Sequence, residues 1–392
     1  MKKALLLFAT ALTVGWAFWP RPVLTHEKVK TTVSFDREIV RILNKRCIAC
    51  HTENNLSVPF TSYEKTRPWA RAIEDEVLRR HMPPWRAISG YGKFVNDNGM
   101  TNRELQFLVA WIEGNGPKTK DQTLIVNLDQ MGGEDDERLK VDFEKWQLGK
   151  ADLLAPIAVN TIAPGQGDEV RRVIVDLKLT SDRRVRALEF KPGDRRVVRA
   201  AYFSVQETGQ WLGSWTPWYG VTTLPKDTAF VVPAGSHIVA EIHSRSTDVP
   251  VDERGTLGLY FAPGSAAYSP TDLVVEAKRE ATTSNQRLQR FSGSVTLAGD
   301  ASVFAFKPEV QPGLHSYEVS AKKPDGTVQV LLLVRDVLPA WPTPYILEEP
   351  MMLTKGTEVS FVAYYGTGGA VQVPADVKLT MSNIPRAVVT TQ

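Results

Sequence analysis

The sequence predicts a multidomain α plus β protein, in which an all-α N-terminal domain is followed by two β-sandwich domains of the jelly-roll kind. Three observations lead to this fold class. The chain has 392 residues, enough for roughly two to four domains of ordinary size. Apolar residues recur at helical spacing before residue 117 and at alternating positions after residue 151. The 27 Gly and 25 Pro residues supply the turns that many short strands need.

The composition excludes several classes of protein. With 43% hydrophobic and 23% charged residues the chain is close to the globular average, so general disorder is excluded. The net charge is only +3 and no basic block or stripe occurs, so we expect no nucleic-acid partner. The two cysteines, Cys47 and Cys50, are too few for a disulfide framework.

Residues 1–33 have the layout of an export signal followed by a tether. Two lysines precede an uncharged apolar run at residues 4–19, and prolines end that run. The run is at the short end of what spans a bilayer and no clean cleavage site follows it, so a cleaved signal peptide and a retained inner-membrane anchor both remain open. In either case we expect a periplasmic or other extracytoplasmic protein, with membrane association through residues 4–19 if they are retained.

Residues 34–117 are expected to form the all-α domain. Apolar side chains repeat at helical spacing over residues 35–45 and again over residues 69–80. A third helix is expected after Thr101, where Thr-Asn-Arg-Glu has the spacing of a capping box, and the run Gly-Asn-Gly-Pro that ends at Pro117 stops it.

The strongest chemical pattern is Cys47-Ile48-Ala49-Cys50-His51. C-x-x-C-H is the attachment pattern of a c-type haem, because two thiols one helical turn apart can each bond a vinyl group while the adjacent His reaches the iron. A thioredoxin-like dithiol would need a βαβ unit and a zinc site would need a second Cys or His pair, and neither is visible. We therefore expect one covalent haem c in a small class I-like cytochrome c domain.

The sixth iron position has four candidates: His81, Met82, Met100, or no protein ligand at all. Met82 is favoured because the two prolines that follow it stiffen the segment and would hold the thioether in place. A Met ligand also raises the haem potential, which suits an electron carrier. His81 is explained equally well as a solvated helix end, and Met100 as a core residue. The predicted iron ligands are therefore His51 and Met82.

Several stretches of this domain share their residues and spacing with a known family. These stretches are Phe35-Asp36-Arg37-Glu38-Ile39, the Cys47–His51 pattern, Pro68-Trp69, Met82-Pro83-Pro84-Trp85 and the segment from Leu105 to Ile112. Together they resemble the cytochrome c module of bacterial multidomain proteins. In that family the module is often followed by a copper type II, ascorbate-dependent monooxygenase-like region.

The rest of the chain predicts a linker and two β-sandwich domains. Residues 118–150 are polar and show no sustained periodicity, which is typical of a linker. Alternating and β-branched stretches then predict one sandwich over residues 151–264 and a second over residues 265–392. The expected strands cover residues 170–179, 185–190, 230–232, 238–242, 257–261, 292–297, 303–306, 317–320, 328–334, 359–364 and 377–381.

Short collinear stretches in both sandwiches resemble the two halves of a peptidylglycine hydroxylating monooxygenase-type core. They span about residues 151–382. In the first half they are Phe190–Val198, Gly213–Pro217, Val232–Ser236 and Glu241–His243, and in the second half Pro312–His315, Lys323–Gly326 and Leu353–Thr357.

Most copper ligands of that family are missing from this sequence. The family binds its first copper with a His-His pair and a later His, whereas this chain has Arg199-Ala200 at the pair and keeps only His243. The second copper uses His-x-His and a Met, of which His315 survives and Met381 is a candidate. One ligand per site does not hold copper, and a guanidinium is no ligand. We therefore expect no bound copper, with His243 and His315 as weak candidates.

These observations favour an exported monohaem cytochrome that transfers electrons, in which the β module docks or scaffolds a larger redox complex. Its expected partners are redox proteins, including a membrane electron-transfer complex, and a non-catalytic role is favoured over an enzyme. The alternative is an active copper monooxygenase fed by its own haem, and a third reading is a haem-based sensor with an open sixth position. Trp215, Trp218 and Tyr219 are candidates for an aromatic docking anchor, with core packing as the other explanation.

Overall fold

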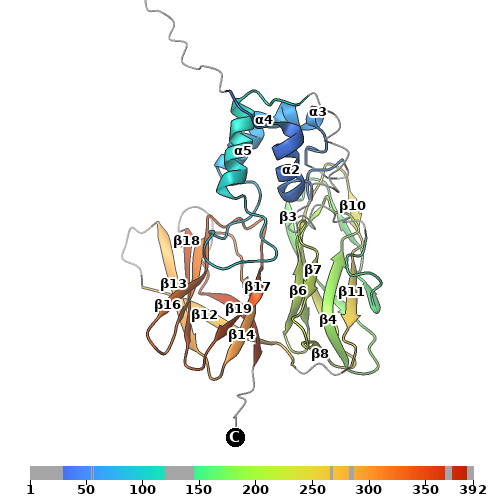
Figure 1. Ribbon diagram of the computed structural model, residues 1–392. Helices are drawn as coiled ribbons and strands as arrows, with labels where there is room; N and C mark the ends of the chain where they lie inside the picture. Colours follow the sequence, from blue (N-terminus) through green and yellow to red (C-terminus); the bar gives the residue numbers. More distant parts are fainter. Residues whose placement is uncertain are drawn as a thin grey trace, which may run out of the picture.

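A computed structural model describes residues 30–53, 55, 57–119, 145–264, 268–281, 287–366 and 373–385. The predicted export segment and most of the predicted linker lie outside these described residues. Within them, a helical region sits at one end of two β units that stand side by side (Figure 1). No helix in this part of the chain is long and apolar enough to cross a membrane.

The helical region contains short helices around a small apolar core. Helix α5 shows the predicted capping box: the Thr101 hydroxyl accepts a hydrogen bond from the Glu104 N–H at 3.1 Å, and the Glu104 carboxylate accepts one from the Thr101 N–H at 2.7 Å. Trp111 is fully buried in the core of this region. The elements are a π-helix η1 (Phe35–Ile39), α2 (Val40–Arg46), α3 (Tyr63–Thr66), a 3₁₀-helix η2 (Arg67–Trp69), α4 (Ala70–Leu78) and α5 (Asn102–Glu113).

The first β unit is built from two larger antiparallel sheets with one core between them, and β2 and β10 form a further two-stranded sheet. A four-stranded sheet has the order β3-β9-β5-β6, and a five-stranded sheet has the order β1-β11-β4-β7, with β8 also paired to β4. Phe190, Phe203 and Trp215 fill the core. The strands are β1 (Leu153–Pro156), β2 (Asn160–Ile162), β3 (Asp168–Asp176), β4 (Arg183–Lys191), β5 (Val198–Val205), β6 (Trp211–Trp215), β7 (Val221–Thr223), β8 (Phe230–Val232), β9 (His237–Arg245), β10 (Val251–Glu253) and β11 (Thr256–Phe261).

The C-terminal β unit is one eight-stranded antiparallel sheet wrapped around its own core. Its strand order is β16-β15-β18-β13-β12-β19-β14-β17, so β16 and β17 are its edges. Phe291, Phe306 and Phe361 are fully buried inside it. The strands are β12 (Thr271–Arg279), β13 (Leu288–Thr296), β14 (Ala301–Pro308), β15 (Leu314–Lys322), β16 (Val328–Arg335), β17 (Tyr345–Leu353), β18 (Glu358–Gly366) and β19 (Asp376–Pro385).

The predicted fold class, with an independent all-α class I-like cytochrome c domain at the N-terminus, is wrong. The described chain is mainly β, and its helices are short. Residues 79–101 contain no helix; instead, Ala87 forms a bridge with Val334 and Phe94 with Leu347 in the C-terminal β unit. The physical reason is the pair of prolines after Met82, which prevents a helix and leads the following apolar side chains into the nearby sheet. The predicted domain boundaries at residues 34, 117, 150 and 264 stay predictions.

The two β units contact each other directly. The Trp211 N–H donates to Asp272 Oδ2 at 2.7 Å, which joins β6 to β12. Trp211 also packs into a small apolar cluster with Phe304 and Ile346 of the C-terminal unit. The Lys307 ammonium of β14 lies over the Trp211 ring at 5.9 Å. The helical region therefore rests on two units that are themselves joined.

Candidate functional site

A cavity of about 150 Å³ lies beside helices α2 and α4. Its walls are mostly apolar. All but one of the described residues that line it belong to the helical region and the segment after it; the exception is Trp341, from the connection between β16 and β17. The lining residues are Arg46, Cys47, Cys50, His51, Ser57, Val58, Phe60, Trp69, Ala72, Ile73, Glu76, Val77, Met82, Pro83, Pro84, Asn98 and Trp341.

Both cysteines line this cavity because the chain turns tightly where α2 ends. The Cys47 N–H donates to the Leu43 carbonyl at 2.8 Å, and the N–H groups of Cys50 and His51 both donate to the Cys47 carbonyl, at 3.0 and 2.9 Å. This single turn brings Cys47, Cys50 and His51 to one side of the cavity. In the structure, the Cys-x-x-Cys-His pattern therefore places three side chains around the same cavity.

The two thiols are held in their neutral form. Burial raises the pKa of the Cys47 thiol to about 12. Burial also raises the pKa of Cys50, against the opposing effect of the Arg195 and Arg199 charges. Reactive dithiols have lowered pKa values, so this pair does not match a redox-active thiolate site.

The His51 ring is fixed in one tautomer. Its Nδ1 lies 2.7 Å from the Val58 carbonyl oxygen, which can only accept, so Nδ1 carries the proton and Nε2 keeps a lone pair. The ring stacks on Phe60 with centroids 4.2 Å apart. Burial lowers the pKa of His51, which favours the neutral ring. A neutral imidazole with Nδ1–H bound to a carbonyl is the usual form of a metal-ligating histidine.

Of the three side chains proposed for the sixth iron position, Met82 alone lines the cavity. It follows α4 and is half-buried, with buried prolines behind it. His81 is exposed and its Nδ1 lies 3.4 Å from Glu76 Oε2. Met100 packs against the apolar core of the helical region. The structure therefore places a thioether and an imidazole in one cavity.

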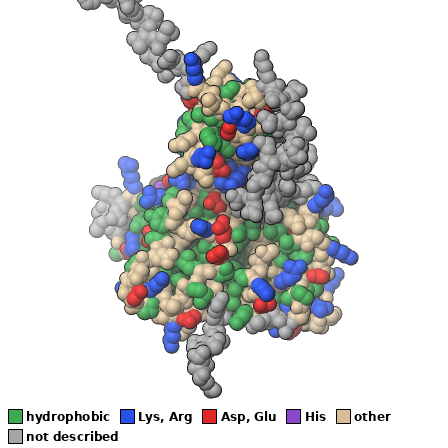
Figure 2. All heavy atoms as spheres, in the orientation of Figure 1, with side chains coloured by type: hydrophobic (Ala, Val, Ile, Leu, Met, Phe, Trp, Pro, Cys, Tyr) green, Lys and Arg blue, Asp and Glu red, His purple; other side chains and the backbone are tan. Residues whose placement is uncertain are grey.

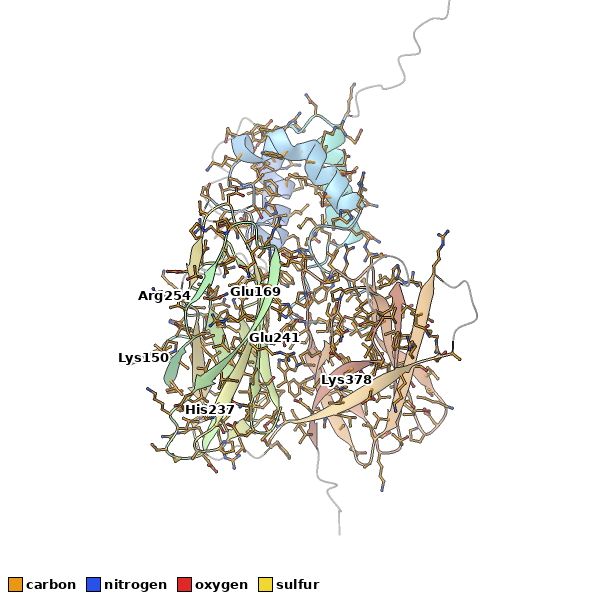
Figure 3. All side chains as sticks on the ribbon, turned by 180° about the vertical axis from the view of Figure 1, so that it is seen from behind. Lys150, Glu169, His237, Glu241, Arg254 and Lys378 are labelled. Carbon is orange, nitrogen blue, oxygen red and sulfur yellow. The ribbon has the colours of Figure 1, made fainter. Side chains whose placement is uncertain are left out.

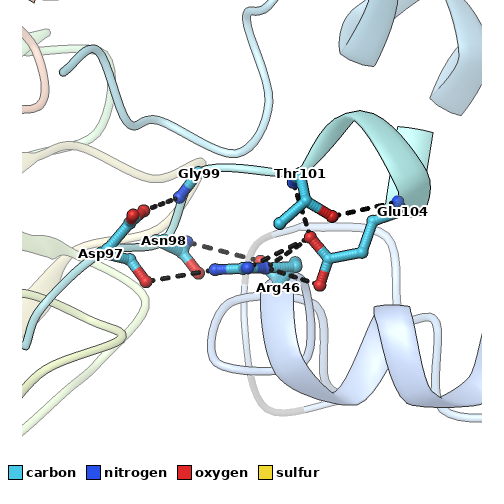
Figure 4. A network of polar contacts seen from close by, with 6 residues as sticks. All are labelled: Arg46, Asp97, Asn98, Gly99, Thr101 and Glu104. Atoms are coloured by element: carbon cyan, nitrogen blue, oxygen red, sulfur yellow. Dashed lines mark hydrogen bonds and ion pairs between the residues drawn. The ribbon is translucent and has the colours of Figure 1, made fainter. Parts of the chain in front are cut away.

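A buried ion pair ties the residue before Cys47 to the segment that follows Met82 (Figure 4). The Arg46 guanidinium donates to both Glu104 oxygens at 3.1 to 3.3 Å and to the Asp97 carbonyl at 3.1 Å. The Asn98 amide donates to the Arg46 carbonyl at 3.5 Å. The Arg46 side chain is only 5% exposed. Removing one partner of such a pair is costly, because the other charge stays buried.

The first β unit reaches the cavity through two arginines. Arg195 donates to the Ala49 carbonyl, inside the Cys47–His51 loop, at 3.3 Å, and to the Pro217 carbonyl at 2.6 Å. Arg199 lies at a register shift in β5, and its guanidinium stacks over the Trp341 ring at 4.3 Å. A bulge of this kind changes the direction in which a side chain points. The first β unit therefore supports the Cys47–His51 loop and Trp341 from behind, while the other two parts of the fold line the cavity.

The residues proposed as weak copper ligands are not grouped. His243 lies opposite Ala200 across β5 and β9, and its Nε2 is 3.0 Å from Glu241 Oε1. His315 is exposed on β15, and Met381 is fully buried in the C-terminal core. In the part of the chain that the structure describes, no three His, Cys, Asp or Glu side chains form a group that fits a metal ion. The donor set therefore does not fit copper.

Sequence reasoning missed the residues by which the β units complete the cavity. Trp341 sits between prolines in a loop, which is the only local sign that it has a special place. Trp215 is buried, so core packing explains it. Trp218 is half-buried, and its indole N–H donates to the Asn96 carbonyl at 3.0 Å. These tryptophans hold the molecule together internally.

Comparison with known proteins gives no family. No family model matches the chain, and no curated protein matches it. Among solved structures it is similar to the major capsid protein P2 of bacteriophage PM2, with 9% identity over 60% of this chain and 98% of that chain and a TM-score of 0.26. It is also similar to a peptide-N(4)-(N-acetyl-β-D-glucosaminyl)asparagine amidase, with 11% identity over 59% of this chain and 96% of that chain and a TM-score of 0.28. Likenesses at such TM-scores carry no argument about function.

Proposed function

We propose that this chain is an exported monohaem c-type cytochrome that transfers electrons between redox partner proteins, a membrane complex among them, rather than a copper monooxygenase. The observation that supports this proposal is a single cavity that gathers the thiols of Cys47 and Cys50, the Nε2 lone pair of His51 and the thioether of Met82. Imidazole and thioether are the two axial ligands of electron-carrying cytochromes.

The lining of the cavity suits the chemistry of haem c. Its mostly apolar walls suit a flat, largely apolar ligand. The neutral thiols of Cys47 and Cys50 match the attachment reaction, in which each sulfur bonds one vinyl carbon while its proton moves to the other. No oxidant is consumed in that addition.

Each residue has a defined part in the proposed site. The Val58 carbonyl holds His51 so that Nε2 is left for the iron. Met82 offers a neutral sulfur, which favours the reduced state and raises the potential. Phe60 and Ile73 belong to the walls that exclude water. The haem, when bound, supplies an iron that takes up and gives off one electron.

In this proposal the β units scaffold the haem site and present the outer surface to partner proteins. Arg195 of the first unit donates to the Cys47–His51 loop, and Trp341 of the C-terminal unit lines the cavity. Lys, Arg, Asp and Glu side chains are interspersed over one face of the molecule, without a large region of one sign (Figure 2). Docking on that face would rest on shape and local pairs rather than on a single-sign field.

The decisive experiment is the intact mass of the exported protein, expressed together with a cytochrome c maturation system. We expect the mass of the processed polypeptide plus one haem, and a coloured protein whose spectrum changes reversibly with one electron. A colourless sample with the bare polypeptide mass would contradict the proposal.

The ligand assignment is tested by Met82→Ala, with Met100→Ala as the matched control. Met82→Ala should keep the covalent haem, lose the red absorption band of a Met–Fe(III) bond and lower the potential. Met100→Ala should keep that band, because Met100 packs in the helical core instead. Loss of the band only in the Met100 variant would show that the ligand is misassigned.

The copper alternative is tested on the same protein by copper loading and dialysis. The proposal expects no retained copper, because His243 and His315 are not grouped with other ligands. Near-stoichiometric copper per chain would favour the monooxygenase instead.

A further inference from the structure

The segment that follows Met82 leaves the helical region and enters the C-terminal β unit. Pro83, Pro84 and Trp85 are all buried directly after the half-buried Met82. The chain returns to the helical region at Asp97, whose carbonyl accepts from Arg46. Residues 83–96 therefore form a loop that lines the cavity at its start and then packs mainly on the C-terminal β unit.

This segment pairs with both edges of the eight-stranded sheet. On the β16 edge, the Ile88 N–H donates to the Leu333 carbonyl at 2.8 Å. On the β17 edge, the Val95 N–H donates to the Ile346 carbonyl at 2.9 Å, and the Glu348 N–H donates to the Lys93 carbonyl at 3.0 Å. Sheet edges expose unpaired backbone groups, and residues 86–95 cover part of both edges. The segment is a structural element of the C-terminal unit.

Two side chains anchor the segment at its ends. Trp85 is 6% exposed, and its ring meets the edge of Tyr345 with centroids 5.2 Å apart. Asn96 is 2% exposed; its amide donates to the Pro344 carbonyl at 2.7 Å and its side-chain oxygen accepts from the Ile346 N–H at 3.2 Å. These contacts all belong to β17 and the residue before it.

The connection between Met82 and the first anchor has little slack. Only the two prolines separate Met82 from Trp85, and their rings restrict the backbone. The Trp85 N–H also donates to the Pro83 carbonyl at 2.8 Å. Moving the Met82 backbone away from the cavity would therefore pull Trp85 out of an apolar core.

We propose that the C-terminal β unit fixes Met82 in the cavity, with Trp85 and Asn96 as positioning residues. This inference rests on the proposed function, since it concerns the sixth ligand of the proposed haem. The C-terminal β unit would thus hold the Met82 thioether at the iron only while residues 83–96 stay docked on β16 and β17.

The test uses full-length holoprotein and the variant Trp85→Leu, with Phe291→Leu as the matched control. Phe291 is fully buried in the same core, and its ring contact is Tyr365 on β18. Trp85→Leu should keep covalent haem, lose most of the Met–Fe(III) band and bind CO about tenfold faster when reduced, because Met82 is released more often. Phe291→Leu should lower the melting temperature and leave band and CO rate unchanged.

A second pair decides the question if Trp85→Leu does not fold. Asn96→Ala removes the two anchoring hydrogen bonds, and Asn383→Ala removes a comparable buried amide that donates to the Thr271 carbonyl instead. Only Asn96→Ala should weaken the band. Unchanged spectra in the Trp85 and Asn96 variants, or equal losses in the controls, would overturn the inference. A wild-type protein without covalent haem would instead overturn the proposed function beneath it.

Discussion

The two sides of the cavity are built in different ways. On the helical side, the His51 ring is held by a near neighbour, the Val58 carbonyl, although Arg195 of the first β unit also donates to the loop. The other side consists of Trp341 and the Met82 segment, which is held by contacts such as the hydrogen bond from Asn96 to Pro344, 248 residues later. The attachment pattern is thus local in the chain, whereas closure of the cavity depends on the whole fold.

The largest effect is expected when haem attachment on the helical side is abolished and the β units are left unchanged. Cys47→Ser combined with Cys50→Ser should abolish covalent haem and loosen the helical region, because the cofactor fills much of its small core. The two β units should stay folded, since each has its own apolar core. Intact mass and hydrogen exchange of the strands measure both results. Ser57→Ala, which also alters a cavity residue, should keep the haem. Unfolding of the whole chain would show that the sides are not separable.

The next effect concerns the ion pair that joins the sides. Glu104→Gln should destabilise the protein by about 3 kcal/mol, because Arg46 is left charged and buried. Glu113→Gln breaks an exposed pair with Arg71 and should cost less than about 1 kcal/mol. Denaturant unfolding of both variants gives the two values. Similar losses of unfolding free energy in the two variants would mean that the Arg46–Glu104 pair does not stabilise the fold more than an exposed pair does.

A smaller effect is expected where the two β units approach each other. In Figure 3, Glu241 lies on the side of the first unit that faces the C-terminal unit. The hydrogen bond from His243, with help from Arg172 and against the effect of burial, lowers the pKa of Glu241 from 4.5 to about 2. Since the folded pKa is depressed, the added stability is present above pH 4.5 and is lost as pH falls toward 2.

Glu241→Gln should therefore cost about 2 kcal/mol at neutral pH, allowing for solvent screening, and flatten the acid side of the stability profile. Melting temperatures measured from pH 2 to 7 check this. Glu207→Gln is the control, because Glu207 pairs with His237 at an exposed position of the first unit alone. A profile of the Glu241 variant that still falls like the wild type would place the acid-sensitive group elsewhere.

The smallest effect compares two tryptophans that line the cavity from opposite sides. Trp341→Ala removes the stacking of Arg199, worth about 1 kcal/mol, and opens the wall that the C-terminal unit supplies. CO should bind the reduced protein faster. Trp69→Ala removes a half-exposed ring on the helical side and should leave that rate unchanged. Equal CO-binding rates in the Trp341 and Trp69 variants would show that Trp341 has no distinct role in closing the cavity.

The parts of the site that were predictable are those with local causes. The Cys47–His51 spacing, the stiffening prolines after Met82 and the capping box of α5 each act within a few residues, so the sequence shows them directly. The docking of Trp85 and Phe94 in the core of the C-terminal β unit was not predicted, because their partners there lie far along the chain and leave no local pattern. The approach of Arg199 to Trp341 depends on a bulge and on two joined units, neither of which leaves a local pattern.

The pairing of residues 86–95 with β16 and β17 has a consequence for the order in which the molecule is completed. Synthesis runs from the N-terminus, so the Cys47–His51 loop leaves the ribosome more than 270 residues before β16. Until the C-terminal unit has folded, residues 86–95 would lack their docking edges and the cavity would lack Trp341. Haem attachment should therefore be easier before β16 and β17 are in place than after.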